Sequence, residues 1–349
     1  HTRKHSFPTR RSSDLGELPH PRHVYDLFGH DGPAAAAAEA FASGRMHHAW
    51  MITGPKGCGK ATLAWRLARR VLGAAPADDG APLGSDPADP VCRRLEARSH
   101  PDLLLIRRPW NEKTKKLRGE ITVDEARKAP DFFSRSPSDG GWRVAIVDCA
   151  DELNTNAANA LLKTLEEPPK RGLLLLIVNS PGRLLPTIRS RCRRLSLRAP
   201  HIEACARWLR DHHQIAATEA EGAASLAGGA PGRALALQET GAPALKASLD
   251  AALAELPKLD RGAVMKLADA AGRKGGDALK ATVLEFLGDF ARDRARASAL
   301  GGPGVAGARA WVEAADQVTR LARDSETLYL DPKQTVHAAF AVLQDAADA

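Results

Sequence analysis

The chain has 349 residues, of which 44% are hydrophobic, so we expect a globular protein of two or three domains rather than a disordered one. No apolar run approaches the roughly 18 residues that a membrane span needs, and the five cysteines form no C-x-x-C pair. We therefore expect a cytoplasmic protein without a membrane partner, a zinc site or a disulfide framework. The net charge of +8 permits a polyanion partner but is also typical of an ordinary basic surface.

Residues 1–20 form an N-terminal arm in our interpretation. The string 1–15 is basic and serine-rich, shows no hydrophobic period, and lacks the apolar stretch of a targeting signal. It resembles translated cloning sequence. We therefore predict a disordered or non-native segment and begin the fold at residue 21.

The stretch Gly54–Thr62 fits the phosphate-binding pattern G-x-x-x-x-G-K-[ST] at every position except the last. An apolar run, 49–53, precedes it and a helix with an apolar stripe follows it, which is the strand–loop–helix context that such a loop requires. The magnesium-binding hydroxyl is replaced by the methyl group of Ala61. Thr62 lies about 100° further round the helix, so it should not substitute. The candidate nucleotide-binding residues of this stretch are Gly54, Gly57, Gly59, Lys60 and Thr62.

The helix after the loop carries Arg66, Arg69 and Arg70 outside its apolar stripe. We interpret these three arginines as a solvated face. A short apolar strand is predicted at 103–106. The segment 107–118, with six Lys or Arg and one Trp, favours a mobile surface hairpin over a contact with DNA.

Further strands and helices continue an alternating pattern. Helices are predicted over 121–133, opening near Thr122, and after a cap at Asn154; strands are predicted at 143–148, 173–178 and 194–197. The run 173–178 is continuously apolar, which is typical of a central parallel strand covered on both faces. Strands that alternate with helices, with a phosphate loop after the first strand, indicate an α/β fold with a doubly wound parallel sheet.

After Pro200 no strand-like run appears, and alanine-rich helical segments follow. Three apolar stripes with helical spacing, within 283–290, 311–321 and 336–343, predict packed helices. The expected layout is an α/β domain over 21–200, a small helical domain over 201–242 and a second helical domain over 243–349.

Nucleotide hydrolysis needs a magnesium ligand, an acid at a strand end and a residue that orients water, besides the phosphate cradle. Asp148 stands where the strand-end acid belongs, but the next position, where a water-activating carboxylate is usual, is Cys149. With Ala61 and Cys149 in these places, we expect the chain to be at most a weak ATPase. Binding of ATP stays possible because Lys60 and Asp148 are retained. Asp151 and Glu152, one turn further on, are expected to face elsewhere.

Ser190-Arg191-Cys192 comes just before the last strand, in a stretch crowded with arginines. One interpretation is a basic loop. The other is that Arg191 reaches into the nucleotide site of a neighbouring subunit as an arginine finger, a contribution worth about 10³–10⁵ in rate. A chain can in this way lose its own hydrolysis and still act in that of its neighbour.

Several motifs resemble one known family. The segments 99–102 (Ser-His-Pro-Asp), 161–169 (Leu-Leu-Lys-Thr-Leu-Glu-Glu-Pro-Pro) and 190–192 resemble signatures of bacterial sliding-clamp loaders, which belong to the AAA+ class. Segments 121–127 and 156–160 are similar to the delta-prime branch of that family, a part of the DNA polymerase III holoenzyme. The resemblance is dense over residues 45–200 and thin beyond.

The resemblance implies an AAA+ P-loop ATPase-like domain, a helical lid and a C-terminal collar that oligomerises with gamma/tau and delta subunits. It implies a role in loading the sliding clamp onto primed DNA, with this chain reaching clamp and DNA weakly or only through the complex. Arg191 is then expected to serve the ATP site of a gamma/tau subunit, while Asn179 and Arg233 match the first and second sensor positions. Many relatives carry a four-cysteine zinc module, where this chain has only Cys92, so no zinc is expected.

Two alternatives stay open. The chain is a catalytically active AAA+ ATPase of gamma/tau type if the retained Lys60 and Asp148 support turnover. It is a stand-alone DNA-binding protein if the basic segment 107–118 binds DNA without partners. The holoenzyme is a DNA-directed DNA polymerase, but nothing in this chain indicates polymerisation.

Overall fold

The computed structural model describes residues 19–112, 116–138, 141–239, 241–273, 276–300 and 305–348. The chain folds into two compact units. The first contains the described residues up to Ile215 together with residues 227–234, and the second contains residues 216–226 together with the described residues from Leu235 onward. The predicted arm falls outside the described residues up to residue 18.

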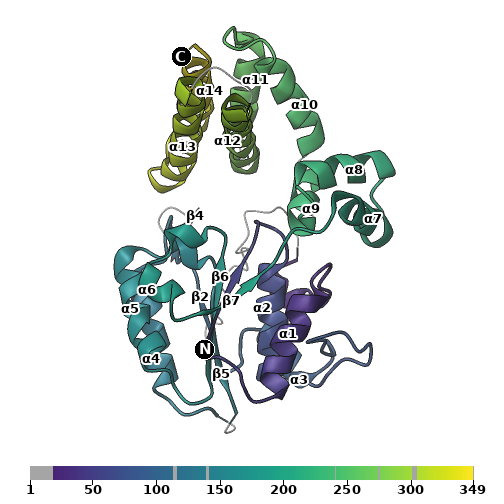
Figure 1. Ribbon diagram of the computed structural model, residues 1–349, viewed down its shortest axis with the longest axis vertical. Helices are drawn as coiled ribbons and strands as arrows, with labels where there is room; N and C mark the ends of the chain where they lie inside the picture. The colour runs from purple at the N-terminus through teal and green to yellow at the C-terminus, as the bar shows by residue number, and fades with distance from the viewer. Residues whose placement is uncertain are drawn as a thin grey trace, which may run out of the picture. The chain divides into compact units, whose positions relative to one another are not determined.

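A five-stranded sheet forms the middle of the first unit (Figure 1). Its strands stand in the order β2-β5-β6-β1-β7, and all neighbouring pairs are parallel. The strands are β1 (Ala49–Thr53), β2 (Leu103–Ile106), β5 (Arg143–Val147), β6 (Gly172–Val178) and β7 (Arg193–Ser196). Every residue of β1, β5 and β6 is buried, as expected for strands with helices on both faces. The predicted doubly wound α/β fold is confirmed.

Successive residues of the central strand β6 pack into two separate cores. Leu173, Leu175 and Ile177 belong to one core, and the residues between them belong to the other. The first core is completed by α1 (Asp31–Ala42), α2 (Lys60–Val71) and α3 (Pro90–Glu96), and the second by α4 (Val123–Phe133) and α5 (Thr155–Glu166). Figure 1 shows these two groups of helices on opposite sides of the sheet.

Local signals set the ends of two helices. The side-chain oxygen of Asn154 accepts the N–H of Ala157 at 2.9 Å, so the predicted cap of α5 is confirmed. Helix α4 begins directly after Thr122, as predicted, although the Thr122 side chain makes no capping hydrogen bond. The short elements are η1 (Pro21–His23), η2 (Ala150–Glu152), η3 (Pro181–Arg183) and α6 (Pro186–Arg189).

The basic segment 107–118 contains the predicted hairpin. Strand β3 (Trp110–Asn111) pairs in antiparallel fashion with β4 (Lys116–Leu117), while residues 113–115 lie outside the described part. Before the hairpin, Arg108 forms an ion pair with Glu152 at 3.0 Å. At least this arginine is therefore engaged within the chain.

The expectation of a solvated arginine face on α2 is wrong. Arg69 is fully buried; its guanidinium donates to the carbonyls of Arg22 and Val24 and lies over the ring of Tyr25 at 3.9 Å. Arg66, only 6% exposed, donates to the carbonyl of Tyr25. The N-terminal segment lies across this face of α2, and buried backbone carbonyls there require donors. The helical periodicity of α2 cannot reveal that a non-helical segment from elsewhere in the chain covers these side chains.

The second unit is helical. Its helices are α8 (Ala217–Leu226), α10 (Ala242–Leu253), α11 (Arg261–Ala271), α12 (Asp277–Leu300), α13 (Val305–Thr327) and α14 (Pro332–Asp348). The predicted stripes supply buried residues such as Leu287, Val318 and Phe340 to its core. The ammonium group of Lys333 on α14 lies 2.7 Å from the carboxylate of Asp269 on α11.

The predicted helical domain 201–242 does not appear as a separate compact unit. Its first helix, α7 (Ile202–His213), groups with the sheet, whereas α8 groups with the C-terminal helices. Helix α9 (Pro231–Glu239) begins in the first unit and ends in the second. The assignment of lid and collar functions to 201–242 and 243–349 stays a prediction. Across the described ranges, no helix is long and apolar enough to span a membrane.

Candidate functional site

The sheet topology brings the nucleotide-site candidates to one edge. Thr53, the last residue of β1, pairs with Val178, the last residue of β6. The glycine loop that follows β1 and Asn179, which follows β6, therefore leave the sheet side by side. Strand β5 lies on the other side of β6, and Asp148 follows it. In a parallel sheet this carboxyl edge, at a point where the strand order reverses, is where ligands bind.

The glycine loop has the backbone that its sequence requires. Gly57 and Gly59 adopt φ angles of +77° and +104°, in the left-handed region that favours glycine. A Cβ atom added to Gly57 would lie 2.3 Å from the backbone nitrogen of Arg233, far inside contact distance. The loop is therefore fixed by its own torsion angles and by close packing against the start of α9.

That packing includes a hydrogen bond. The N–H of Gly232, in the first turn of α9, donates to the carbonyl of Gly57 at 2.8 Å. Arg233, the candidate second sensor, comes directly after this contact. The structure thus places Arg233 beside the phosphate loop, although the two segments are far apart in the sequence.

The side chain of Lys60, the first residue of α2, points back toward the glycine loop. Its side chain is buried, and Nζ donates to the carbonyls of Gly54 at 2.7 Å and Pro55 at 2.5 Å. Burial lowers the pKa of Lys60 from its ordinary value, although the nearby carboxylates of Asp151 and Asp148 act in the opposite direction. Two of the three N–H donors of the ammonium group are thus engaged with the loop itself, and one remains for a phosphate.

A buried histidine that the sequence did not single out supports the loop. His30 Nε2 lies 2.6 Å from the carbonyl oxygen of Cys58, and burial lowers the pKa of the imidazole. The ring is therefore neutral near pH 7, with Nε2–H donating to the carbonyl. No periodic pattern in the sequence indicates this contact, because His30 precedes α1 and the loop follows β1.

The acidic end of β5 carries Asp148 and then Cys149. Cys149 has a left-handed backbone, with φ of 60°, and its Sγ lies 3.8 Å from Oδ1 of Asp148. Burial and the neighbouring carboxylates raise the pKa of the Cys149 thiol far above its usual range. Nδ2 of Asn179 lies 3.6 Å from the same Sγ. The candidate first sensor and the position of the missing carboxylate are therefore in contact, but a neutral thiol cannot act as a base there.

Asp151 has a role that the sequence analysis missed. Its buried carboxylate accepts the backbone N–H groups of Asn179 at 3.0 Å and Ser180 at 3.2 Å. It therefore holds the backbone that presents Asn179. The expectation that Asp151 faces elsewhere is wrong, whereas Glu152 does turn away, toward Arg108. The contact joins two loops of the same sheet edge, which local sequence patterns do not report.

The residues present do not fit a magnesium nucleotide. At the first turn of α2 the methyl group of Ala61 replaces the expected oxygen ligand, and Thr62 follows one residue later. Mg²⁺ requires oxygen ligands in near-octahedral geometry. We therefore derive no chemical step through a metal ion in this chain.

Arg191 lies at the opposite edge of the sheet. Arg193, the first residue of β7, pairs with Trp50 near the start of β1, whereas Ser196 pairs with Thr53 beside the glycine loop. Arg191 precedes β7. The length of at least three strand residues, roughly 10 Å, therefore separates its backbone from the end of β7 that lies beside the glycine loop. The structure therefore does not bring Arg191 together with the other candidates.

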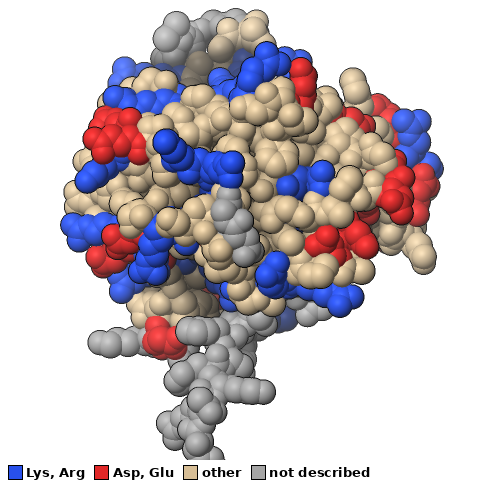
Figure 2. Space-filling view, turned by 90° about the horizontal axis from the view of Figure 1, so that it is seen from below, with Lys and Arg blue, Asp and Glu red and all other residues tan. Residues whose placement is uncertain are grey.

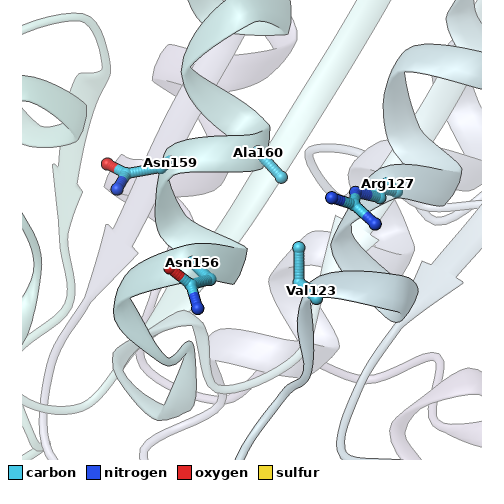
Figure 3. A pocket seen from close by; sticks show the side chains of 5 residues that line it. All are labelled: Val123, Arg127, Asn156, Asn159 and Ala160. Atoms are coloured by element: carbon cyan, nitrogen blue, oxygen red, sulfur yellow. The ribbon is translucent and has the colours of Figure 1, made fainter.

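A separate pocket lies between α4 and α5. It is lined by Val123 and Arg127 of α4 and by Asn156, Asn159 and Ala160 of α5 (Figure 3). The guanidinium of Arg127 lies 3.9 Å from the carboxylate of Asp124 in the preceding turn. None of the nucleotide-site candidates lines this pocket.

A parallel sheet with a glycine-rich phosphate loop after one central strand and an acid after another defines a domain of the P-loop NTPase type. Residues 32–201 match the family model described as "DNA polymerase III, delta subunit". Residues 32–201 belong to this family, and the delta-prime resemblance of the sequence motifs is confirmed for this part of the chain.

Curated relatives agree with this assignment. The DNA polymerase III subunit delta' of Pseudomonas aeruginosa is 40% identical over 162 residues, 46% of either chain. The subunit delta' of Escherichia coli is 34% identical over 201 residues, 57% of this chain and 56% of that one. The subunit tau of Escherichia coli is 32% identical over 183 residues, 52% of this chain and 26% of that one. This chain thus spans about half the length of the delta' relatives that it matches.

Among solved structures, a DNA polymerase III gamma subunit-related protein of Thermotoga maritima shows 20% identity and a TM-score of 0.42. The alignment covers 86% of this chain and 95% of that one. This likeness is too low to add to the family assignment.

Proposed function

We propose that the chain is a clamp-loader subunit of delta-prime type in the DNA polymerase III holoenzyme. In this role it joins gamma/tau and delta subunits to help load the sliding clamp onto primed DNA, without hydrolysing ATP itself. The proposal is supported by the family of residues 32–201 and by the similarity to delta' and tau subunits. It extends this support to the whole chain and to its partners.

One observation carries the proposal. A phosphate loop with its glycine backbone intact has an alanine methyl at the magnesium position and a neutral thiol at the position of the water-activating carboxylate. The ammonium group of Lys60 donates to carbonyls of the loop itself. Two separate requirements of hydrolysis are thus missing while the fold around them is kept.

The second part of the proposal concerns Arg191, which we assign to the ATP site of an adjacent gamma/tau subunit. The guanidinium lies at the surface, with 37% of the side chain exposed. Its backbone lies roughly 10 Å or more, measured along β7, from the end of the sheet that carries the phosphate loop of its own domain. An arginine at this place acts on a nucleotide only if a neighbouring subunit presents one. An arginine finger supplied in trans is worth about 10³–10⁵ in rate.

Reconstitution with gamma/tau, delta, clamp and primed DNA tests both parts. The purified chain alone should show no steady ATP turnover with ATP and primed DNA. In the complex, Arg191→Ala should leave assembly intact and lower the ATPase rate by at least about a hundredfold at the sites that Arg191 serves. Arg189→Ala, which removes an exposed guanidinium two residues away, is the matched control. An unchanged rate for Arg191→Ala excludes the role in trans.

A catalytically active ATPase of gamma/tau type is the second candidate. It is favoured by the retained Lys60 and Asp148 and by the 32% identity to the tau subunit. Steady turnover by the chain alone would establish it. Stand-alone DNA binding has weaker support: Arg108 is engaged with Glu152, and the face in Figure 2 shows basic side chains interspersed with acidic ones. That alternative requires salt-sensitive DNA affinity without partners.

A further inference from the structure

An ion pair joins the last residue of α5 to the segment before β7. We propose that Glu166 is a positioning residue for Arg191, which holds the guanidinium in one orientation before the neighbouring nucleotide site is engaged. This inference rests on the proposed role of Arg191 in trans. It adds a specific residue, Glu166, to that function.

Two contacts fix the guanidinium. Nη2 of Arg191 lies 3.1 Å from Oε1 of Glu166, and Nη1 donates to the carbonyl of Thr187 at 3.0 Å. The two acceptors come from different elements, the end of α5 and the α6 turn. The planar guanidinium is thus held at two of its nitrogens, which restricts the torsion angles of an otherwise flexible side chain.

The location of Glu166 argues for a task other than helix stability. Glu166 is the last residue of α5, and a carboxylate at a helix C-terminus is unfavourable because the helix dipole places negative charge there. Arg189 and Arg193 also flank Arg191 with like charge in the sequence. The carboxylate of Glu166 therefore offsets this repulsion and gives the guanidinium a defined partner at a place where the helix itself gains nothing from an acid.

The ion pair is compatible with a phosphate contact. A guanidinium has five N–H donors, and the two contacts with Glu166 and Thr187 use two of them. Three donors remain for the oxygens of a nucleotide held by a neighbouring subunit. Glu166 therefore can stay in contact while Arg191 acts, in the same way that a buried acid orients a catalytic base in other enzymes.

The expected effect is small but distinct. The side chains of Arg191 and Glu166 are 37% and 51% exposed, and ion pairs at such sites are weak. Loss of the carboxylate should lower the ATPase kcat at the sites that Arg191 serves by about two- to fivefold, far less than loss of the arginine itself. The KM for ATP should not change, because Glu166 orients a group that acts in the transition state.

The test uses the reconstituted complex with gamma/tau, delta, clamp and primed DNA. Glu166→Gln keeps the shape of the side chain and removes its charge, while Glu167→Gln makes the same change at the adjacent exposed acid. Glu166→Asp keeps the charge and should recover part of the rate. The double variant with Arg191→Ala should be no slower than Arg191→Ala alone, because Glu166 acts only through the arginine.

The outcomes separate this inference from the proposed function. If Arg191→Ala leaves the rate unchanged, the role in trans fails, and the role of Glu166 fails with it. If Arg191→Ala lowers the rate but Glu166→Gln equals or exceeds the wild type, the positioning role alone is overturned. A further loss from Glu166→Gln in the Arg191→Ala background also overturns it. Equal assembly and equal melting temperature of all variants support the reading of the rates as functional effects.

Discussion

Gly57→Ala tests whether the phosphate loop holds the start of α9 in place by direct packing. The substitution places a methyl group at φ of +77°, with its Cβ 2.3 Å from the backbone nitrogen of Arg233. Relief requires the start of α9 to move by about 1 Å, since ordinary van der Waals contact of a Cβ atom begins at about 3.4 Å. That movement breaks the hydrogen bond from Gly232 to the carbonyl of Gly57.

Three contributions set the magnitude. A non-glycine residue in the left-handed region costs about 1–2 kcal/mol. Overpacking against backbone adds about 1–3 kcal/mol. The lost hydrogen bond adds about 0.5–1.5 kcal/mol. Gly44→Ala is the matched control, because Gly44 has φ of +69° but nothing within 4 Å of an added Cβ. We expect a loss of about 3–5 kcal/mol for Gly57→Ala and about 1–2 kcal/mol for Gly44→Ala.

Urea unfolding of the two variants gives the difference in free energy, and amide hydrogen exchange locates it. Exchange should accelerate at the amides of residues 232–234 in Gly57→Ala and stay at the wild-type rate there in Gly44→Ala. Equal free energies of unfolding for the two variants, with unchanged exchange at residues 232–234, would refute the idea that the loop holds the start of α9.

Two further predictions concern stability. Asp151→Asn leaves one of the N–H groups of Asn179 and Ser180 facing an NH2 group instead of an acceptor oxygen, so the free energy of unfolding in urea should fall by about 1–3 kcal/mol. An unchanged value contradicts the role of Asp151. Burial lowers the pKa of His20 from 6.5 to about 3. The unfolded chain therefore binds the extra proton below pH 6.5, and stability should fall with pH by up to about 1.4 kcal/mol per unit toward pH 3. His20→Phe should flatten this slope in urea titrations at several pH values; the same slope in both proteins contradicts the assignment.

Much of the fold follows from local signals. The apolar run 49–53 coincides with β1 because a glycine loop ends it, and Asn154 marks the start of α5 because its side chain satisfies a free N–H of the first turn. The continuous run at 173–178 identifies the central strand, since only a strand with helices on both faces is apolar at every residue. These features depend on near neighbours in the sequence, and they were predictable for that reason.

The misses share a different cause. Arg66 and Arg69 are buried because an irregular segment that lies before α1 covers them. Asp151 contributes to the site through backbone groups that lie 28 and 29 residues further along the chain. The acid of the Ser-His-Pro-Asp motif, which supported the family resemblance, also has a structural role. The buried carboxylate of Asp102 accepts hydrogen bonds from Nε–H of Arg143 and from the backbone N–H of Ser138, each at 3.0 Å. Contacts between segments that are distant in the sequence leave no periodic pattern, so sequence patterns do not predict them.

The phosphate loop shows why a motif predicts fold more safely than chemistry. Its glycines are required here by positive φ angles and by the close approach of Arg233, and its lysine bonds to carbonyls of the same loop. These requirements hold with or without a nucleotide. The positions that hydrolysis alone requires, Ala61 and Cys149, carry neither the hydroxyl nor the carboxylate. A match to the loop pattern therefore reports the strand–loop–helix backbone, while the test of catalysis lies at those two positions and, in the proposed complex, at Arg191 on the opposite edge of the sheet.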